Sequence, residues 1–464
     1  MKPNNLKFFH LVKSMPLGLD VFIWISRNLS LHFVLLNIFV LLVLIYINRS
    51  SLYSLFARLT KRDFLALVAI FVLALSLRLI GDSCVTASAK LWEHVDTAEY
   101  FLRGEPLDIE DVGYPKGYAT LLFVFFTLFG RRFVTIFWLN VVASSLTAIS
   151  VFLIAFLLCK HKATSYFASF IYAVFPLSIY YSQFSSEMIC SVFFLSLAAI
   201  FTLVALEFKT SNSLCLAFTS LVLAVSFRLE NVVLVAAFLI ACLLFFKKKE
   251  LPKFAAPLAI ALLLSLALIG FFLQAPHSFG FVESRANDPL CQSTECFIRK
   301  FFPDARPSLF TLDFFILNLS TLLRAFIDER FFPLLILFFL PFSLGYCWRN
   351  NKKVILLLLW VLGFFIGFSL YWATWFVNYE LYMLQLTVPL SVLAALGTDF
   401  FYNTFRKHPF FMRGSRPIAQ ILLLALLAFL FFRMFTHTDV YAKGEPCFFD
   451  ELNEANKLIG NECI

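Results

Sequence analysis

Charged residues are scarce in this chain of 464 residues: they make up 14% of it, whereas 61% of the residues are hydrophobic. Soluble globular domains carry about 25% charged residues, so the composition excludes a water-soluble fold of this length. The alternation of apolar and polar residues that is typical of membrane β-barrel strands is also missing. The sequence therefore predicts an all-α integral membrane protein.

Two further absences narrow the class of protein. The ten cysteines show no spacing typical of metal ligands, so no protein-only metal site is expected. Cys291 with Cys296, and Cys447 with Cys463, could form disulfides on an oxidising side of the membrane, but spacing alone establishes neither pair. Residues 1–30 lack a small-x-small cleavage site after an apolar core, so no removed signal peptide is expected.

An extended basic face is missing as well, although the formal net charge is +9. The Lys and Arg residues occur in short clusters between apolar runs, which is the pattern of cytoplasmic loops in membrane proteins. We therefore expect membrane lipids as partners and no nucleic acid.

What the sequence does contain is a series of apolar runs of roughly 17 to 26 residues, close to the about 20 residues that a helix needs to cross a bilayer. A first span at 31–47 is followed by a basic loop that should be cytoplasmic. The next span, 64–80, then exits, and the loop 81–114, with eight acids, is expected on the outside. Further apolar runs form pairs, in which the first run leaves the cytoplasm and the second returns to it: 164–181 with 188–206, 213–227 with 229–246, and 353–372 with 380–401. A last, unpaired run lies at 417–434.

The predicted architecture is a bundle of roughly eleven to thirteen transmembrane helices, with external loops that carry interfacial helices. Three parts follow along the chain: an N-terminal segment 1–63 with one span, a transmembrane module 64–435, and an external tail 436–464.

Two segments complicate the topology. Between 114 and Lys160 the number of crossings must be odd, so either the apolar run 117–130 is half-inserted or the run 133–158 is bent. The long segment 274–330 should be external, and its apolar part at 311–327 contains polar residues that suit an interfacial amphipathic helix.

Sorting the polar residues by this topology places five charged side chains at one external level. Four of them are Asp96 in the first external loop, Glu187 at the start of a span, and Arg228 and Glu230 at the break in the hairpin 213–246. The fifth is Glu380, which follows Tyr379 and opens another span. Charged residues at membrane depth are costly and commonly mark functional sites. These residues are therefore the first candidates for a site.

Several motifs together resemble the GT-C superfamily of polytopic glycosyltransferases, and most of all its protein-mannosyltransferase-like and lipid A aminoarabinose-transferase-like members. The similarity covers about 64–246 in detail. Two positions depart from the family pattern, since Asn378 stands where arginine is common and Thr97 follows Asp96 where a second acid is common. The matching features are Arg78, Asp96 with Tyr100, Tyr114-Pro115-Lys116-Gly117-Tyr118, Phe129-Gly130, Phe175-Pro176, Tyr181-Ser182, Glu187 and Phe227-Arg228-Leu229-Glu230.

The resemblance implies transfer of a sugar, with inversion, from a polyprenyl-phosphate donor to a hydroxyl of a lipid, glycan or protein acceptor. A carboxylate could take the proton of that hydroxyl, and this role is assigned to Asp96. A guanidinium could stabilise the departing lipid phosphate, with Arg228 as first and Arg78 as second candidate. The reaction would take place on the periplasmic or exterior face of a bacterial inner membrane or an equivalent membrane. Substrate-binding roles are also assigned to Glu187, Lys116, Tyr100, Tyr118 and Glu230.

Structural roles compete with these assignments. Glu187 could simply open a helix, Arg228 could pair with Glu230, and Arg78 could snorkel at a helix end. Lys116 could be an interfacial lysine, and Tyr100, Tyr114 and Tyr118 also fit an aromatic belt. Asp96 with Glu187 could share a divalent metal ion.

Two other functions remain open. A transporter or flippase of lipid-linked saccharide would favour internal repeats and broken central spans, and no repeat is evident. A lipid-linked polysaccharide ligase or polymerase would depend on Arg285, Arg299 and His277 instead of Asp96.

Overall fold

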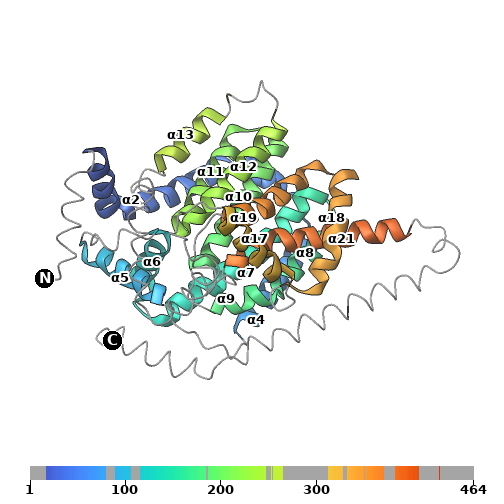
Figure 1. Ribbon diagram of the computed structural model, residues 1–464, viewed down its shortest axis with the longest axis horizontal. Helices are drawn as coiled ribbons and strands as arrows, with labels where there is room; N and C mark the ends of the chain where they lie inside the picture. The colour runs from blue at the N-terminus through green and yellow to red at the C-terminus, as the bar shows by residue number, and fades with distance from the viewer. Residues whose placement is uncertain are drawn as a thin grey trace.

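The computed structural model describes residues 17–79, 89–105, 115–183, 187–246, 252, 254–264, 312–327, 332–349, 351–369, 382–406 and 428. Every regular element within these ranges is a helix (Figure 1), which confirms the predicted all-α class. The helices are α2 (Leu17–Ile47), α3 (Arg49–Phe56), α4 (Lys61–Leu79), α5 (Ala89–Arg103), α6 (Gly117–Phe129), α7 (Phe133–Cys159), α8 (Lys162–Ala173), α9 (Pro176–Gln183), α10 (Glu187–Phe208), α11 (Ser211–Phe227), α12 (Val232–Phe245), α13 (Ala255–Leu264), α17 (Leu312–Ile327), α18 (Leu334–Arg349), α19 (Ile355–Ser369) and α21 (Thr387–Arg406), with 3₁₀ turns η2 (Leu229–Asn231), η4 (Lys352–Val354) and η5 (Leu384–Leu386).

Helices of membrane-spanning length recur along the described part of the chain. The helical segments that are long and apolar enough to cross a bilayer are Asn28–Ile47, Phe133–Cys159, Glu187–Phe208, Lys352–Ser369 and Leu384–Thr404. Helices α8 and α9 meet at a 48° bend and together would add a sixth span, and several apolar helices are shorter. The chain is thus an integral membrane protein. The count of eleven to thirteen spans stays a prediction, because most of the run 417–434 lies outside the described residues.

Helices α7 and α10 form the centre of the bundle (Figure 1). Helix α10 packs on α11 and α7, while α7 also packs on α8 and α4. Both central helices are apolar around most of their circumference, and such helices are stable only when other helices surround them. Small residues such as Ala143, Ser144 and Ser145 let neighbouring helices approach α7 closely.

One end of the bundle gathers basic residues around Glu207, in the last turn of α10. Glu207 lies 3.3 Å from Arg58, 2.9 Å from Lys160 and 3.1 Å from Lys353. These three cations belong to three clusters that are far apart in the sequence and that the charge pattern assigns to the cytoplasmic side. The structure brings them to one end of the molecule, about 30 Å along α10 from Glu187, since a helix rises 1.5 Å per residue.

A second acid anchors the start of α4 on α8 near the same end. The carboxylate of Asp63 accepts hydrogen bonds from the Thr60 backbone N–H at 2.6 Å, Lys162 Nζ at 2.5 Å and the Tyr166 hydroxyl at 2.6 Å. The hydrogen bonds from Lys162 and Tyr166 hold the pKa of Asp63 well below its usual range. Asp63 therefore stays ionised in the folded protein and caps the first turn of α4.

The structure also describes the two segments that complicate the predicted topology, 117–158 and 311–327. Helix α6 has 13 residues and measures about 20 Å, whereas α7 has 27 residues and measures about 40 Å. Since the hydrocarbon core is about 30 Å thick, α6 is the helix that is too short to cross it. Helix α17 coincides with the predicted helix at 311–327 and packs on α19. Its interfacial position stays a prediction.

Candidate functional site

The loop 81–114, which the sequence predicts to be external, contributes one helix to the described structure. Helix α5 packs against α6, and the two lie side by side at one edge of the bundle (Figure 1). Apart from 89–105, the loop 81–114 lies outside the described residues, and so does 274–311, which includes His277, Arg285 and Arg299.

A cluster of buried charges forms where α10 begins and α11 ends. Glu187 is the first residue of α10. Arg228 ends α11 in an extended conformation, with φ −144° and ψ 115°, so the chain turns there before η2 and α12. The break places Arg228 and Glu230 on the same short turn, facing the start of α10.

The arginine lies between two carboxylates. Arg228 Nη1 donates a short hydrogen bond to Glu187 Oε1, and Nη2 donates to Glu230 Oε1 at 2.7 Å. All three side chains are buried: Arg228 is 7% exposed, Glu187 is 5% exposed and Glu230 is 8% exposed. At this burial each charge depends on its partners, because an isolated buried ion is strongly unfavourable.

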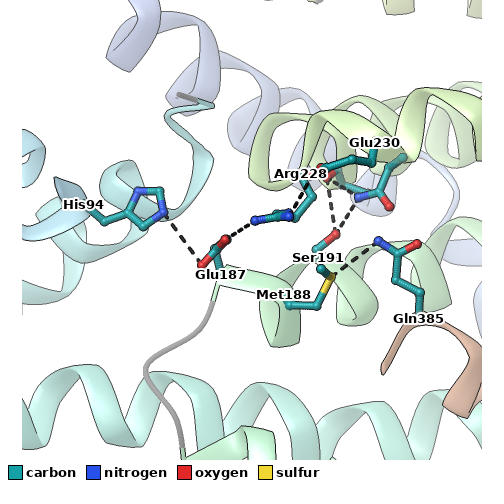
Figure 2. A network of polar contacts seen from close by, with 9 residues as sticks. His94, Glu187, Met188, Ser191, Arg228, Glu230 and Gln385 are labelled. Carbon is teal, nitrogen blue, oxygen red and sulfur yellow. Dashed lines mark hydrogen bonds and ion pairs between the residues drawn. The ribbon is translucent and has the colours of Figure 1, made fainter. Parts of the chain in front are cut away.

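His94 reaches the same cluster from α5. Its Nε2 atom lies 3.8 Å from Glu187 Oε2, and its side chain is 7% exposed. Figure 2 shows Glu187 between His94 and Arg228, with one carboxylate oxygen directed at each. The His94 ring also meets the Tyr118 ring edge-on, with the centroids 5.3 Å apart.

Polar and aromatic contacts hold this turn in place. The Arg228 guanidinium lies 4.9 Å from the centroid of the Tyr382 ring. Asn231 Nδ2 donates to Ser191 Oγ at 2.6 Å and to the Ala224 carbonyl at 2.8 Å, which ties η2 to both α10 and α11. One turn away on α10, Met188 Sδ accepts a hydrogen bond from Gln385 Nε2 at 3.4 Å (Figure 2).

Asp96 lies on the same helix as His94 but on another face. Its side chain is exposed, whereas His94 and Thr97 are buried. Residues two apart in a helix are separated by about 200°, so a helix that turns His94 inward turns Asp96 outward. The structure thus brings together Glu187, Arg228 and Glu230, and it places Asp96 on an exposed face of the helix that His94 joins to the cluster.

Arg78 is completely buried away from this cluster. It donates to Ser144 Oγ at 2.8 Å, to Ser178 Oγ at 2.9 Å and to the carbonyls of Ala74 and Ala173 at 2.8 and 3.1 Å. These acceptors lie on α4, α7 and at the α8–α9 bend. The geometry therefore favours a packing role for Arg78 over the lipid-phosphate contact or the snorkelling position suggested by its sequence.

Three other predicted residues make contacts on α5, α6 and α7. Lys116, before the first turn of α6, is buried and lies 3.5 Å from the Thr97 hydroxyl on α5. The Tyr118 hydroxyl accepts from Asn140 Nδ2 at 2.8 Å, and the Tyr100 ring lies 5.1 Å from the Arg103 guanidinium. Lys116 and Tyr118 thus serve the α5–α6 contact.

Sequence reasoning missed His94, Asn231, Tyr382 and Gln385. The contact of His94 with Glu187 joins two residues that are far apart in the sequence, and no local pattern signals it. Within the described residues no group of three or more His, Cys, Asp or Glu side chains could hold a metal ion. The sharing of a divalent ion by Asp96 and Glu187 stays a prediction.

Comparison with known proteins identifies the class of fold. Residues 115–277 match the family model described as dolichyl-phosphate-mannose-protein mannosyltransferase. Together with the helical architecture, this match confirms the resemblance to GT-C membrane glycosyltransferases. No curated protein sequence matches the chain.

Solved structures of an archaeal oligosaccharyltransferase show the same fold at low sequence identity. The oligosaccharyltransferase AglB from Archaeoglobus fulgidus, solved with an inhibitory peptide and a dolichol-phosphate, is 12% identical, with a TM-score of 0.56 over 86% of this chain and 59% of that one. Its apo form is 13% identical, with a TM-score of 0.54 over 85% and 57%. ArnT from Cupriavidus metallidurans, bound to undecaprenyl phosphate, matches at 12% identity and a TM-score of 0.47 over 74% and 61%. The chain spans less than two thirds of the length of these proteins.

Proposed function

We propose that this protein is a membrane glycosyltransferase that moves a sugar from a polyprenyl-phosphate donor to an acceptor hydroxyl with inversion. The observation that carries the proposal is the buried Arg228, held between Glu187 and Glu230 beside the helix that presents Asp96. The fold similarity and the names of the similar proteins, which include complexes with dolichol-phosphate and undecaprenyl phosphate, support it.

The exposed carboxylate suits the acceptor side of the reaction. Asp96 accepts the proton of the acceptor hydroxyl while the hydroxyl oxygen forms a bond to the anomeric carbon of the sugar. The bond between that carbon and the phosphate oxygen breaks, and its electron pair leaves with the lipid phosphate. Attack from the face opposite the phosphate inverts the anomeric centre.

The guanidinium suits the departing phosphate. Arginine binds phosphate and carboxylate oxygens with the same planar pair of N–H donors. Because Arg228 holds two carboxylates in the structure, a lipid phosphate would compete with one of them. Glu230 is the more easily displaced, since Glu187 is also held by His94.

The position of the charged cluster along α10 supports an active site on the non-cytoplasmic face. The charged cluster lies at the end of α10 opposite Glu207 and its three basic partners. Basic clusters mark the cytoplasmic side. We therefore infer an active site that faces the periplasm or exterior of a bacterial inner membrane or an equivalent membrane, with a lipid, glycan or protein as acceptor.

The test is sugar transfer by the purified protein in nanodiscs. A panel of radiolabelled polyprenyl-phosphate monosaccharides is incubated with the protein and a membrane extract as acceptor source, and release of polyprenyl phosphate is measured. Asp96→Asn should lower turnover at least about 100-fold without affecting folding, because an amide cannot take the proton. Glu105→Gln, an exposed acid just after α5, is the matched control and should remain active.

Two results would contradict the proposal. One is full turnover by Asp96→Asn. The other is passage of the intact labelled donor across a proteoliposome membrane without cleavage, which is the behaviour of a transporter.

A further inference from the structure

Helix α5 carries the exposed Asp96 at one edge of the bundle, and its Leu91, Val95 and Ala98 side chains are buried in the core. It packs chiefly on α6, with Phe101 and Phe123 in edge-to-face contact at 6.3 Å, and Glu99 pairs with Arg131 just after α6. A contact of His94 with Glu187 joins α5 to the charged cluster at the start of α10. His94 therefore links α5 directly to the start of α10, next to Arg228, in addition to the packing of α5 on α6.

The chemistry of this contact is well suited to holding an element in place. Glu187 uses one oxygen for Arg228 and the other for His94, so the carboxylate bridges two elements. Both side chains are buried, and an electrostatic contact shielded from water is screened far less than one on the surface. On its other side the imidazole packs on Tyr118, which leaves the ring little freedom to rotate.

We propose that His94 is a positioning residue: its contact with Glu187 fixes α5, and with it Asp96, at the correct distance from Arg228. The inference rests on the proposed function in one respect only, that Asp96 and Arg228 act on the same substrate. Positioning of this kind affects turnover because small displacements of a catalytic group cost large factors in rate.

The experiment compares three variants in nanodiscs. His94→Phe keeps the ring packing on Tyr118 but removes the nitrogen that faces Glu187. His94→Gln places an N–H near the position of Nε2 and should restore the contact. Glu105→Gln changes an exposed acid just beyond the end of α5 and serves as control.

The first readout is hydrogen exchange of the α5 backbone amides without substrate. His94→Phe should accelerate exchange over 89–103 about tenfold, because the helix detaches from the cluster more often. His94→Gln and Glu105→Gln should exchange as the unchanged protein does. Equal exchange in His94→Phe and the unchanged protein would overturn the inference.

The second readout separates positioning from general stability. For a donor that the protein turns over, His94→Phe should lower kcat about tenfold and leave the donor KM within about twofold, because Arg228 keeps its partners. His94→Gln should recover most of kcat. Faster exchange with unchanged kcat would also overturn the positioning role.

A double-mutant cycle strengthens the assignment. If His94 acts through Glu187, then His94→Phe and Glu187→Gln should accelerate α5 exchange non-additively, and additive effects would contradict the inference. Accelerated exchange in His94→Phe together with no transfer from any donor by the unchanged protein would contradict the proposed function while supporting the anchoring of α5.

Discussion

Arg228 stabilises two buried carboxylates at once, and its removal should therefore cost more than the loss of one ion pair. In Arg228→Leu both Glu187 and Glu230 lose their cation, so we expect a loss of about 3–5 kcal/mol of stability. Arg228→Lys should lose about half as much, since one ammonium cannot form the planar double contact. Thermal unfolding in detergent measures both.

A neutral combination provides the control for this prediction. Arg228→Leu combined with Glu187→Gln and Glu230→Gln removes all three charges, and most of the lost stability should return. If Arg228→Leu alone unfolds at the same temperature as the unchanged protein, the three charges do not depend on one another.

Single residues differ in how well the sequence predicts them. Glu187, Arg228 and Glu230 could be predicted to meet, because a charge within an apolar hairpin has few positions where it can find a partner. The burial of Arg78 could not be predicted, since its acceptors are Ser144, Ser178 and two backbone carbonyls far along the chain. His94 was missed because the sequence does not show which face of α5 turns inward.

At the scale of elements, Gly117 allows α6 to begin against the end of α11. A Cβ atom at this position would lie 2.6 Å from both the backbone oxygen and the Oγ atom of Ser226. Gly117→Ala should therefore push α6 away from the turn at Arg228 and cost about 1–3 kcal/mol of stability, with a matching loss of turnover.

The control for this substitution lies on the same helix. Thr127→Ala alters an exposed side chain of α6 and should change the unfolding temperature little. Comparison of the two unfolding temperatures tests the prediction, and equal values for Gly117→Ala and the unchanged protein would contradict the close packing of α6 on α11.

Element boundaries followed from the sequence better than their roles. The breaks at Gly130 and Arg228 and the helix at 312–327 match the predicted runs. Hydropathy could not decide whether α6 is only half-inserted or α7 is bent, because both runs are apolar. Helix α6 begins at Gly117 and ends just before Gly130, and this short length shows that α6 is the segment that does not cross the bilayer.

For the whole molecule, the structure has two chemically different ends. The basic residues around Glu207 gather at one end of α10, and the cluster of His94, Glu187, Arg228 and Glu230 lies at the other. The charge pattern predicted this separation because Lys and Arg collect on the cytoplasmic side. The identity of the sugar, lipid and acceptor could not be predicted, since pocket shape decides these.

The central claim is that the α5 helix with Asp96 lies on the non-cytoplasmic face while the Glu207 cluster lies in the cytoplasm. Single cysteines at two exposed positions, Glu105→Cys and Arg58→Cys, are introduced into a version of the protein without its ten native cysteines. Intact cells are then treated with a membrane-impermeant maleimide. The account predicts that position 105 is labelled in intact cells and position 58 only after permeabilisation, whereas labelling of both from the same side, or of position 58 alone in intact cells, would contradict it.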